Sequence, residues 1–173
     1  LERREKMIGI LCVNLDANGG LEVVTKRLYN AFKEKSIDVK IYSCKNSEYK
    51  EAISFGIDNK LNKVSIEQII IRMQKDSVDN LIVQLNDPYS CILANVTLYK
   101  KLNESAIKVF TVLHNSPKSF LVHYPYLFDS RFISWVKCLR ANLILAPKAK
   151  RIIKKINKFS FFVSISKGVK FEL

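Results

Sequence analysis

The residues MIGILCV at positions 7–13, followed by NLDANGG at positions 14–20, decide the fold. Seven apolar or small residues without polar alternation are typical of a strand that is buried on both faces, as in a parallel sheet. The next seven residues are rich in turn formers. Apolar residues then recur at helical spacing to about position 35, at Leu21, Val24, Leu28, Ala31 and Phe32. A strand, a short loop and a helix in this order open a βαβ unit.

Short apolar runs and segments of helical period keep alternating along the chain, which is typical of successive βαβ units. We expect further strands at residues 39–42, 81–85, 107–113, 143–145 and 161–165. We expect helices at residues 47–55, from Ser65, from Asp87 to about 103, from Asp129 and from Pro147. Ser65 and Gln68 fit a capping box at the start of the second of these helices. The sequence therefore predicts an α/β fold, a Rossmann-like three-layer sandwich with a mostly parallel sheet.

Composition supports one ordinary globular domain. The chain has 173 residues, of which 48% are apolar, and about 150 residues per domain is the usual size. Four scattered cysteines, no Cys-x-x-Cys pair and two histidines indicate neither a metal site nor a disulfide framework. No apolar run reaches the ~18 residues of a membrane span. The charged start before residues 7–13 superficially resembles a signal peptide, but the apolar run is short and fits a buried strand better.

Charge is concentrated in the second half of the chain. The net charge is +13, and residues 1–86 hold 14 basic and 12 acidic side chains, whereas residues 87–173 hold 15 basic and 4 acidic ones. Such a field suggests a polyanionic neighbour: nucleic acid, an anionic membrane surface or a phosphorylated substrate. A solvated basic surface without a partner is the alternative.

The loop at residues 14–20 is the first candidate site, because ligands of open parallel sheets bind at the carboxyl ends of the strands. Gly19 and Gly20 let the backbone approach an anion, and the helix N-terminus after them favours phosphate. The loop lacks the G-x-G-x-x-G fingerprint and the Gly-Lys-Ser/Thr of a P-loop. A simple strand-to-helix turn explains the two glycines about equally well.

The second candidate is His114, which follows the strongest predicted strand and precedes Asn115 and Ser116. An imidazole there can donate a hydrogen bond to a substrate hydroxyl or polarise a leaving group near neutral pH. We predict His114 as the catalytic candidate and Asn115 and Ser116 as polar groups of the same cleft. A structural histidine with its hydrogen bonds satisfied is the competing interpretation.

Aromatic and basic residues in the second half form a third candidate surface. Six aromatic residues lie between positions 120 and 135, among them Tyr124, Phe128 and Trp135. They form either core packing or a wall that contacts a sugar or lipid. Residues 148–158 hold six basic residues and no acid, with Lys150, Arg151 and Lys154 among them. Such a helix either binds anionic lipid headgroups or is simply solvated. Nucleic acid is less favoured, since no recognition motif is present.

In order and content these segments resemble the N-terminal half of a retaining glycosyltransferase of the GT-B type, family 4-like, which builds bacterial surface polysaccharides and glycolipids. The resemblance covers nearly the whole chain. It rests on IGILCVN at 8–14 with Gly19-Gly20, EVVTKRLYNAF at 22–32, DVKIYS at 38–43, VLHNSP at 112–117, LILAP at 143–147 and SISKGVKF at 164–171.

The resemblance implies one half of a GT-B fold, with the N-terminal domain at residues 1–166 and the start of an interdomain linker at 167–173. It implies that the donor phosphates lie beside Gly19 and Gly20, and that His114 lies close to the transferred sugar. The substrates would be a nucleotide-sugar donor and a saccharide or lipid-linked acceptor, with no cofactor and no metal. The donor-binding domain would follow the linker, so this half alone is expected to be inactive. The expected location is the cytoplasm, at the inner face of the membrane.

A second function from another class fits the same residues. A stand-alone, non-enzymatic Rossmann-like module would bind a phosphorylated or polyanionic partner through the basic surface.

Overall fold

The computed structural model of the chain describes residues 6–17, 19–86, 88, 91–114, 135–136 and 139–164. Its elements, in chain order, are β1 (Met7–Cys12), α1 (Gly20–Glu34), β2 (Val39–Ser43), β3 (Ala52–Ser54), α2 (Lys63–Lys75), β4 (Val78–Leu85), α3 (Val96–Glu104), β5 (Lys108–Leu113), the π-helical turn η1 (Ala141–Leu145), α6 (Ala146–Ile156) and β6 (Phe161–Ser164).

The six described strands form one sheet in the order β3-β2-β1-β4-β5-β6, and every neighbouring pair is parallel. Ile10 at the centre of β1 pairs with Ile41 of β2 on one side and with Ile82 of β4 on the other. The chain moves outward from β1 to β3 and then crosses back to β4, so the winding reverses between β1 and β4. This is the strand order of doubly wound Rossmann folds.

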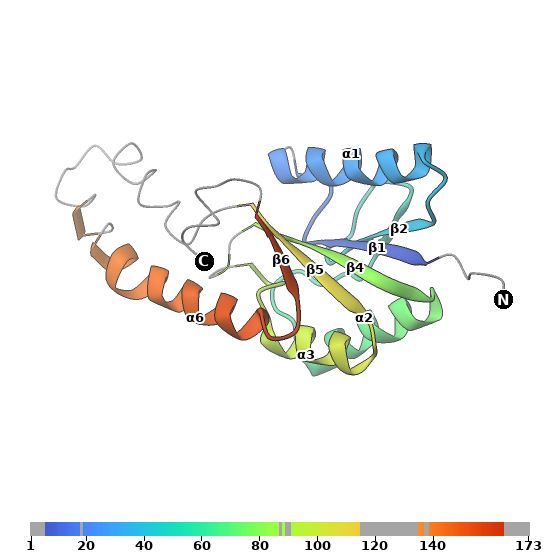
Figure 1. The fold of residues 1–173 in the computed structure, drawn as a ribbon. Coiled ribbons are helices and arrows are strands. Elements are labelled where there is room, and N and C mark those ends of the chain that lie inside the picture. The colour runs from blue at the N-terminus through green and yellow to red at the C-terminus, as the bar shows by residue number, and fades with distance from the viewer. Residues whose placement is uncertain are drawn as a thin grey trace.

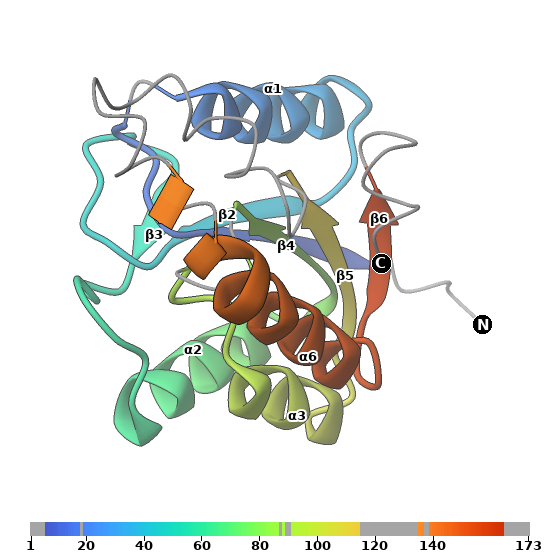
Figure 2. The same cartoon turned by 90° about the vertical axis from the view of Figure 1, so that its left-hand side faces the viewer.

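Helices lie on both faces of the sheet (Figure 1). The α1 helix packs over β1 and β2 on one face, and α2, α3 and α6 lie on the other. Figure 2 shows the three layers from the side. The predicted α/β class and Rossmann-like sandwich are therefore confirmed. Within the described ranges, no helix combines the length and apolar composition needed to cross a bilayer.

The core has two parts, one on each face of the sheet. The larger contains fully buried residues of β4, α2 and α3 such as Leu81, Met73 and Tyr99. The smaller lies under α1 and includes Ile10 and Ile41. Side chains of β1, β2 and β4 alternate between the two parts, which explains why these strand sequences are apolar without a polar period.

Two element predictions of the first half are wrong in detail. Residues 47–55 do not form a helix, because Ser47 and Glu48 donate hydrogen bonds to the Asp16 carboxylate, and the chain then extends into β3 beside β2. The α2 helix begins three residues earlier than predicted. Asn62 is its N-cap, and the Asn62 side chain accepts from the Ser65 N–H while the Ser65 hydroxyl accepts from the Asn62 N–H.

Two further predictions fail later in the chain. The third helix begins after Asn95, whose side chain accepts hydrogen bonds from two backbone N–H groups of the first turn, and not at Asp87. Residues 143–145 are helical and run directly into α6, so the expected strand is absent there. A run of three apolar residues fits either structure, and Pro147 is tolerated because it lies in the first turn of α6. The helix predicted from Asp129 lies mostly outside the described residues.

Candidate functional site

The carboxyl ends of the parallel strands meet at one edge of the sheet, and both sequence candidates lie there. Gly19 and Gly20 follow β1 through a short loop, and His114 comes directly after β5. The β4 strand lies between β1 and β5 in the sheet. The His114 N–H donates a hydrogen bond to the carbonyl of Leu85, the last residue of β4 (3.0 Å). The structure therefore brings the glycine loop and the imidazole to the same edge.

A cleft of about 280 Å³ opens at this edge, where the winding of the sheet reverses between β1 and β4. Crevices at this position are the usual ligand sites of doubly wound sheets. The lining combines amides, carboxylates, a cation and a few apolar groups. It consists of Val13, Asn14, Leu21, Glu22, Lys45, Asp58, Gln84, Asn86, Cys91 and Ile92.

His114 is held beside this cleft by Gln84. The imidazole Nε2 lies 2.5 Å from Gln84 Oε1, and Gln84 is almost fully buried. Because the Gln84 amide presents its oxygen, which is an acceptor, Nε2 carries the proton and donates it to Gln84 Oε1. The other nitrogen of the neutral ring, Nδ1, is then a hydrogen-bond acceptor. Burial lowers the pKa of His114 below its usual value, and the negative charge of Glu22 opposes this only in part. The imidazole is therefore neutral at pH 7 and suited to accept a hydrogen bond from a ligand hydroxyl.

The Glu22 carboxylate lies directly beside Gly19 of the glycine loop. A side chain at Gly19 would place its Cβ 2.4 Å from Glu22 Oε2, so the missing side chain makes room for that carboxylate. Gly19 caps α1 without a side-chain hydrogen bond, and the acidic Glu22 lies in the first turn, where the helix dipole favours negative charge. A Cβ at Gly20 would meet no atom within 4 Å. A donor phosphate at this helix end would therefore have to displace the Glu22 carboxylate.

The Asp16 carboxylate fixes the rim of the cleft. It accepts hydrogen bonds from the Ser47 hydroxyl (2.7 Å) and the Glu48 N–H (3.0 Å), and the Asp16 N–H donates to the Asn14 side chain. The hydrogen bond from Ser47 lowers the pKa of Asp16, with that from Glu48 adding to it. The loop after β1 is thus tied to the segment after β2, which holds Asn14 in place at the cleft.

Of the other predicted residues, those that the structure describes are not among the residues that line the cleft. Asn115, Ser116, Tyr124 and Phe128 lie outside the described residues. Trp135 is 60% exposed. Lys150, Arg151 and Lys154 are exposed on α6, which lies on the face of the sheet opposite α1 (Figure 2). None of these three basic residues is among those that line the cleft.

Metal binding has no visible basis in the part of the chain that the structure describes. No group of three or more His, Cys, Asp or Glu side chains is placed there to hold an ion. Burial raises the pKa of Cys12 to about 12, with Glu22 adding to the effect. Burial also raises the pKa of Cys44. These thiols stay protonated at neutral pH and behave as small apolar core residues.

Sequence reasoning missed Glu22, Gln84, Asn86 and Asp58, all of which contribute polar atoms to the site. Gln84 had a detectable signal, because it interrupts the apolar run LIVQL at residues 81–85. A buried amide inside a strand needs a hydrogen-bond partner, and His114 provides it. Asp58 had no such signal, since it lies in a polar loop between β3 and α2.

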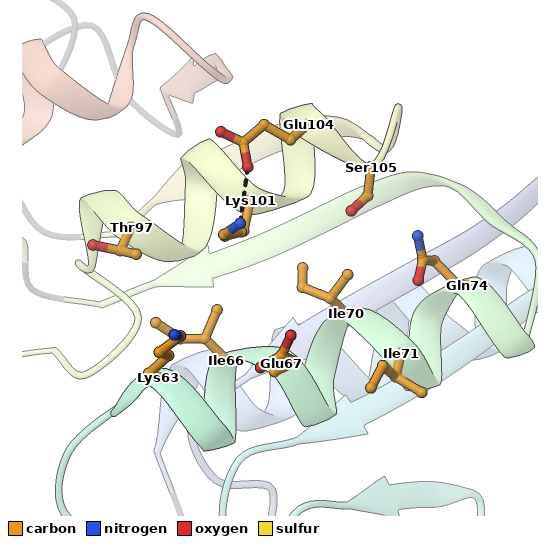
Figure 3. Close-up of a pocket in the computed structure, with 10 residues that line it drawn as sticks. All are labelled: Lys63, Ile66, Glu67, Ile70, Ile71, Gln74, Thr97, Lys101, Glu104 and Ser105. Carbon is orange, nitrogen blue, oxygen red and sulfur yellow. Dashed lines mark ion pairs between the residues drawn. The ribbon is translucent and has the colours of Figure 1, made fainter.

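A second hollow of about 300 Å³ lies between α2 and α3 (Figure 3). We call it the α2/α3 groove, and it is lined by Lys63, Ile66, Glu67, Ile70, Ile71, Gln74, Thr97, Lys101, Glu104 and Ser105. It shares no residue with the cleft and contains none of the residues predicted from the sequence as a site.

Comparison with known proteins adds no assignment to this geometry. No protein-family model matches the chain, and no curated protein matches it with significant similarity. The function must therefore be inferred from the fold, the cleft and the charge distribution.

Proposed function

We propose that this domain is the acceptor-binding half of a retaining glycosyltransferase of the GT-B type, which moves a sugar from a nucleotide-sugar donor to a saccharide or lipid-linked acceptor. The observation that carries the proposal is the cleft between the ends of β1 and β4, with His114 hydrogen-bonded to Gln84 beside it. The resemblance of the sequence segments to that family supports the same conclusion.

The chemistry of the lining supports a sugar ligand. Sugar hydroxyls donate and accept hydrogen bonds, and amide and carboxylate side chains match both roles. Asn14, Asn86 and Gln84 supply amides, and Glu22 and Asp58 supply carboxylates. Lys45 adds a cation that suits a diphosphate or a developing negative charge. Leu21 and Ile92 offer apolar contacts for the faces of a sugar ring.

In this proposal the domain binds and orients the acceptor, and a second domain closes over the nucleotide sugar. Closure excludes water and brings the acceptor hydroxyl to the sugar. Gln84 positions His114, whose neutral imidazole contacts the transferred sugar. We expect the domain alone to bind acceptor sugars weakly and to transfer none.

The proposal is tested by NMR titration of the ¹⁵N-labelled chain with the methyl glycosides of glucose, galactose and mannose, and with UDP-glucose. At least one glycoside is expected to shift the backbone signals of Asn14, Glu22, Asn86 and His114, because these residues border the cleft. Saturable shifts confined to other surfaces, or none with any of the four ligands, would refute it.

A stand-alone module that binds a polyanionic partner is the second candidate, and α6 favours it. Its basic side chains project on the side opposite its buried Ala149, Ile153 and Ile156. Inositol hexakisphosphate in the same titration separates the two functions. Saturable shifts on α6 with this compound, and none at the cleft with glycosides, would support the module instead of the transferase.

We also propose that the domain associates peripherally with an anionic membrane surface. Large apolar side chains are exposed just before the basic helix: Leu143 is 68% exposed, Ile144 57% and Trp135 60%. Lys148, Lys150, Arg151, Lys154, Lys155 and Lys158 follow them without an intervening acid. Exposed apolar groups beside a basic helix face are typical of interfacial binding, and each basic residue contributes about 1 kcal/mol near anionic lipid.

Membrane association is measured by co-sedimentation with vesicles of phosphatidylglycerol and phosphatidylcholine, or of phosphatidylcholine alone. We expect binding to the anionic vesicles only. Leu143→Ser with Ile144→Ser should weaken it at least tenfold, since about 2 kcal/mol of apolar burial is lost. The control pair Val23→Ser with Val24→Ser changes exposed residues of α1 and should leave it unchanged. Equal binding to both vesicles, or equal effects of both pairs, would contradict the proposal.

A further inference from the structure

We propose that the cleft between β1 and β4 binds an acceptor sugar that carries a free, protonated amine, and that Glu22 is the residue that selects it. The acceptor is then an amino sugar such as glucosamine, in preference to a neutral or a phosphorylated sugar. This inference rests on the proposed function, because it names the class of sugar that the same cleft takes. It predicts a preference between ligands, which is measured separately from sugar binding itself.

The charged side chains that line the cleft are mostly acidic, although the net charge of the chain is +13. Glu22 and Asp58 contribute carboxylates, and Lys45 contributes the one cation of the described lining. Lys26 follows Glu22 by one turn of α1 but is not part of the lining, and its Nζ lies 5.2 Å from the centre of the Tyr49 ring. The cleft is therefore an acidic site in a basic protein, and its field favours a cationic ligand group over an anionic one.

Of the two carboxylates, Glu22 has the stronger effect on a ligand. Its side chain is half-buried, whereas Asp58 is exposed and its charge is screened by water. In the described part of the chain, the ion pairs form at Asp76 and Glu104 and not at Glu22. A half-buried carboxylate that no described lysine or arginine neutralises gains from a cation that a ligand brings.

The position of the Glu22 carboxylate disfavours an anionic ligand group. Free backbone N–H groups at the start of a helix usually attract a phosphate. At the start of α1 the Glu22 carboxylate lies in the first turn, in the space that a side chain at Gly19 would fill. The protein thus supplies the negative charge at this helix end itself. A phosphate there meets a like charge, whereas an ammonium group forms an ion pair with the same carboxylate.

His114 adds a hydrogen-bond acceptor at the same edge of the sheet. Its Nε2 donates to Gln84 Oε1, so the acceptor is Nδ1. Burial lowers the pKa of His114 and the charge of Glu22 raises it, so the carboxylate lies near enough to act on the imidazole. An ammonium group has three N–H donors and no acceptor. It therefore matches a carboxylate and a neutral imidazole better than a hydroxyl, which offers one donor.

The test compares pairs of methyl glycosides in NMR titrations of the ¹⁵N-labelled chain at about pH 6, where carboxylates are charged and sugar amines are protonated. Each pair joins the glycoside of glucose, galactose or mannose with its 2-amino-2-deoxy counterpart, in which an ammonium replaces one hydroxyl. In at least one pair we expect the amino glycoside to bind at least tenfold more tightly. Acetylation of its amine removes the charge and should abolish this advantage.

Glu22→Gln removes the charge with little change in shape, so the ratio of the two affinities should fall to within about twofold. Glu34→Gln makes the same change at the other end of α1 and should leave the ratio unchanged. Thermal unfolding checks that both variants are folded. An amino glycoside that binds no more tightly than its neutral counterpart in any pair, or a preference that Glu22→Gln retains, would overturn this inference and leave sugar binding intact. Binding of none of the glycosides would refute the proposed function as well.

Discussion

Replacing Gly9 by valine is expected to destabilise the domain by about 3 kcal/mol, because no space exists for a side chain at this position of β1. A Cβ there would lie 3.0 Å from Leu81 Cδ1, 3.1 Å from Val78 Cγ1 and 3.2 Å from Tyr42 Cε2. These side chains are buried in the larger core. The two further methyl groups of valine force them apart, and with them the contact of β1 with β4.

Urea unfolding followed by circular dichroism measures this effect. Gly9→Ala should cost less than the valine, since a single Cβ needs shifts of a few tenths of an ångström and the lower backbone entropy of alanine offsets part of the strain. Gly20→Ala is the control, because a Cβ there meets no atom within 4 Å. A Gly9→Val protein within about 1 kcal/mol of the unchanged chain would contradict the close packing described for β1.

Replacing Asp76 by asparagine is expected to cost about 2 kcal/mol at pH 7. Asp76 ends α2, and its carboxylate accepts hydrogen bonds from Lys40 Nζ (2.7 Å), Arg72 Nε (2.8 Å) and the Tyr42 hydroxyl (2.9 Å). The Asp76 side chain is only 7% exposed. Burial alone would raise its pKa, but the hydrogen bonds from Lys40, Arg72 and Tyr42 outweigh burial and lower the pKa to about 2.

The pH dependence follows from the direction of this shift. The pKa of the folded protein lies below the ordinary value of 3.8, so the charged carboxylate stabilises the fold above about pH 4 and the contribution is lost as the pH falls toward 2. The free energies of unfolding of the two proteins should therefore converge between pH 4 and pH 2. Glu34→Gln, at the exposed end of α1, is the control and should have little effect. A constant difference from pH 7 to pH 2 would show that the Asp76 charge contributes no stability.

The sequence predicted those elements of the fold whose apolar patterns were long. Residues 7–13 were identified as a strand because all seven positions are apolar or glycine, and residues 107–113 because six of the seven positions are apolar or β-branched. The helix from Pro147, which was predicted from a stripe of isoleucines, is also confirmed by the structure. Residues 143–145 were assigned wrongly, since three apolar residues do not distinguish a strand from the helix that they extend.

The edge of the sheet at which the candidate site lies was predictable from the sequence, but the residues that line the cleft were not. The rule that ligands bind at the carboxyl ends of strands led to Gly19, Gly20 and His114. The contact of His114 with Gln84 depends on the pairing of β4 with β5, in which Gln84 lies opposite Val112. The register of two strands depends on how they pack in the folded sheet, so the local sequence does not predict it. The approach of Glu22 to Gly19 depends in the same way on the conformation of the loop after β1.

The most direct test of the central claim, that the cleft between β1 and β4 is the ligand site, is the affinity of the chain for the methyl glycoside that shifts its signals. We predict that Glu22→Gln and Gln84→Ala each weaken this affinity at least tenfold. Glu34→Gln removes the same charge at the other end of α1 and should leave the affinity unchanged. Equal affinities for all three variants, or binding that maps to a surface other than the cleft, would contradict the claim.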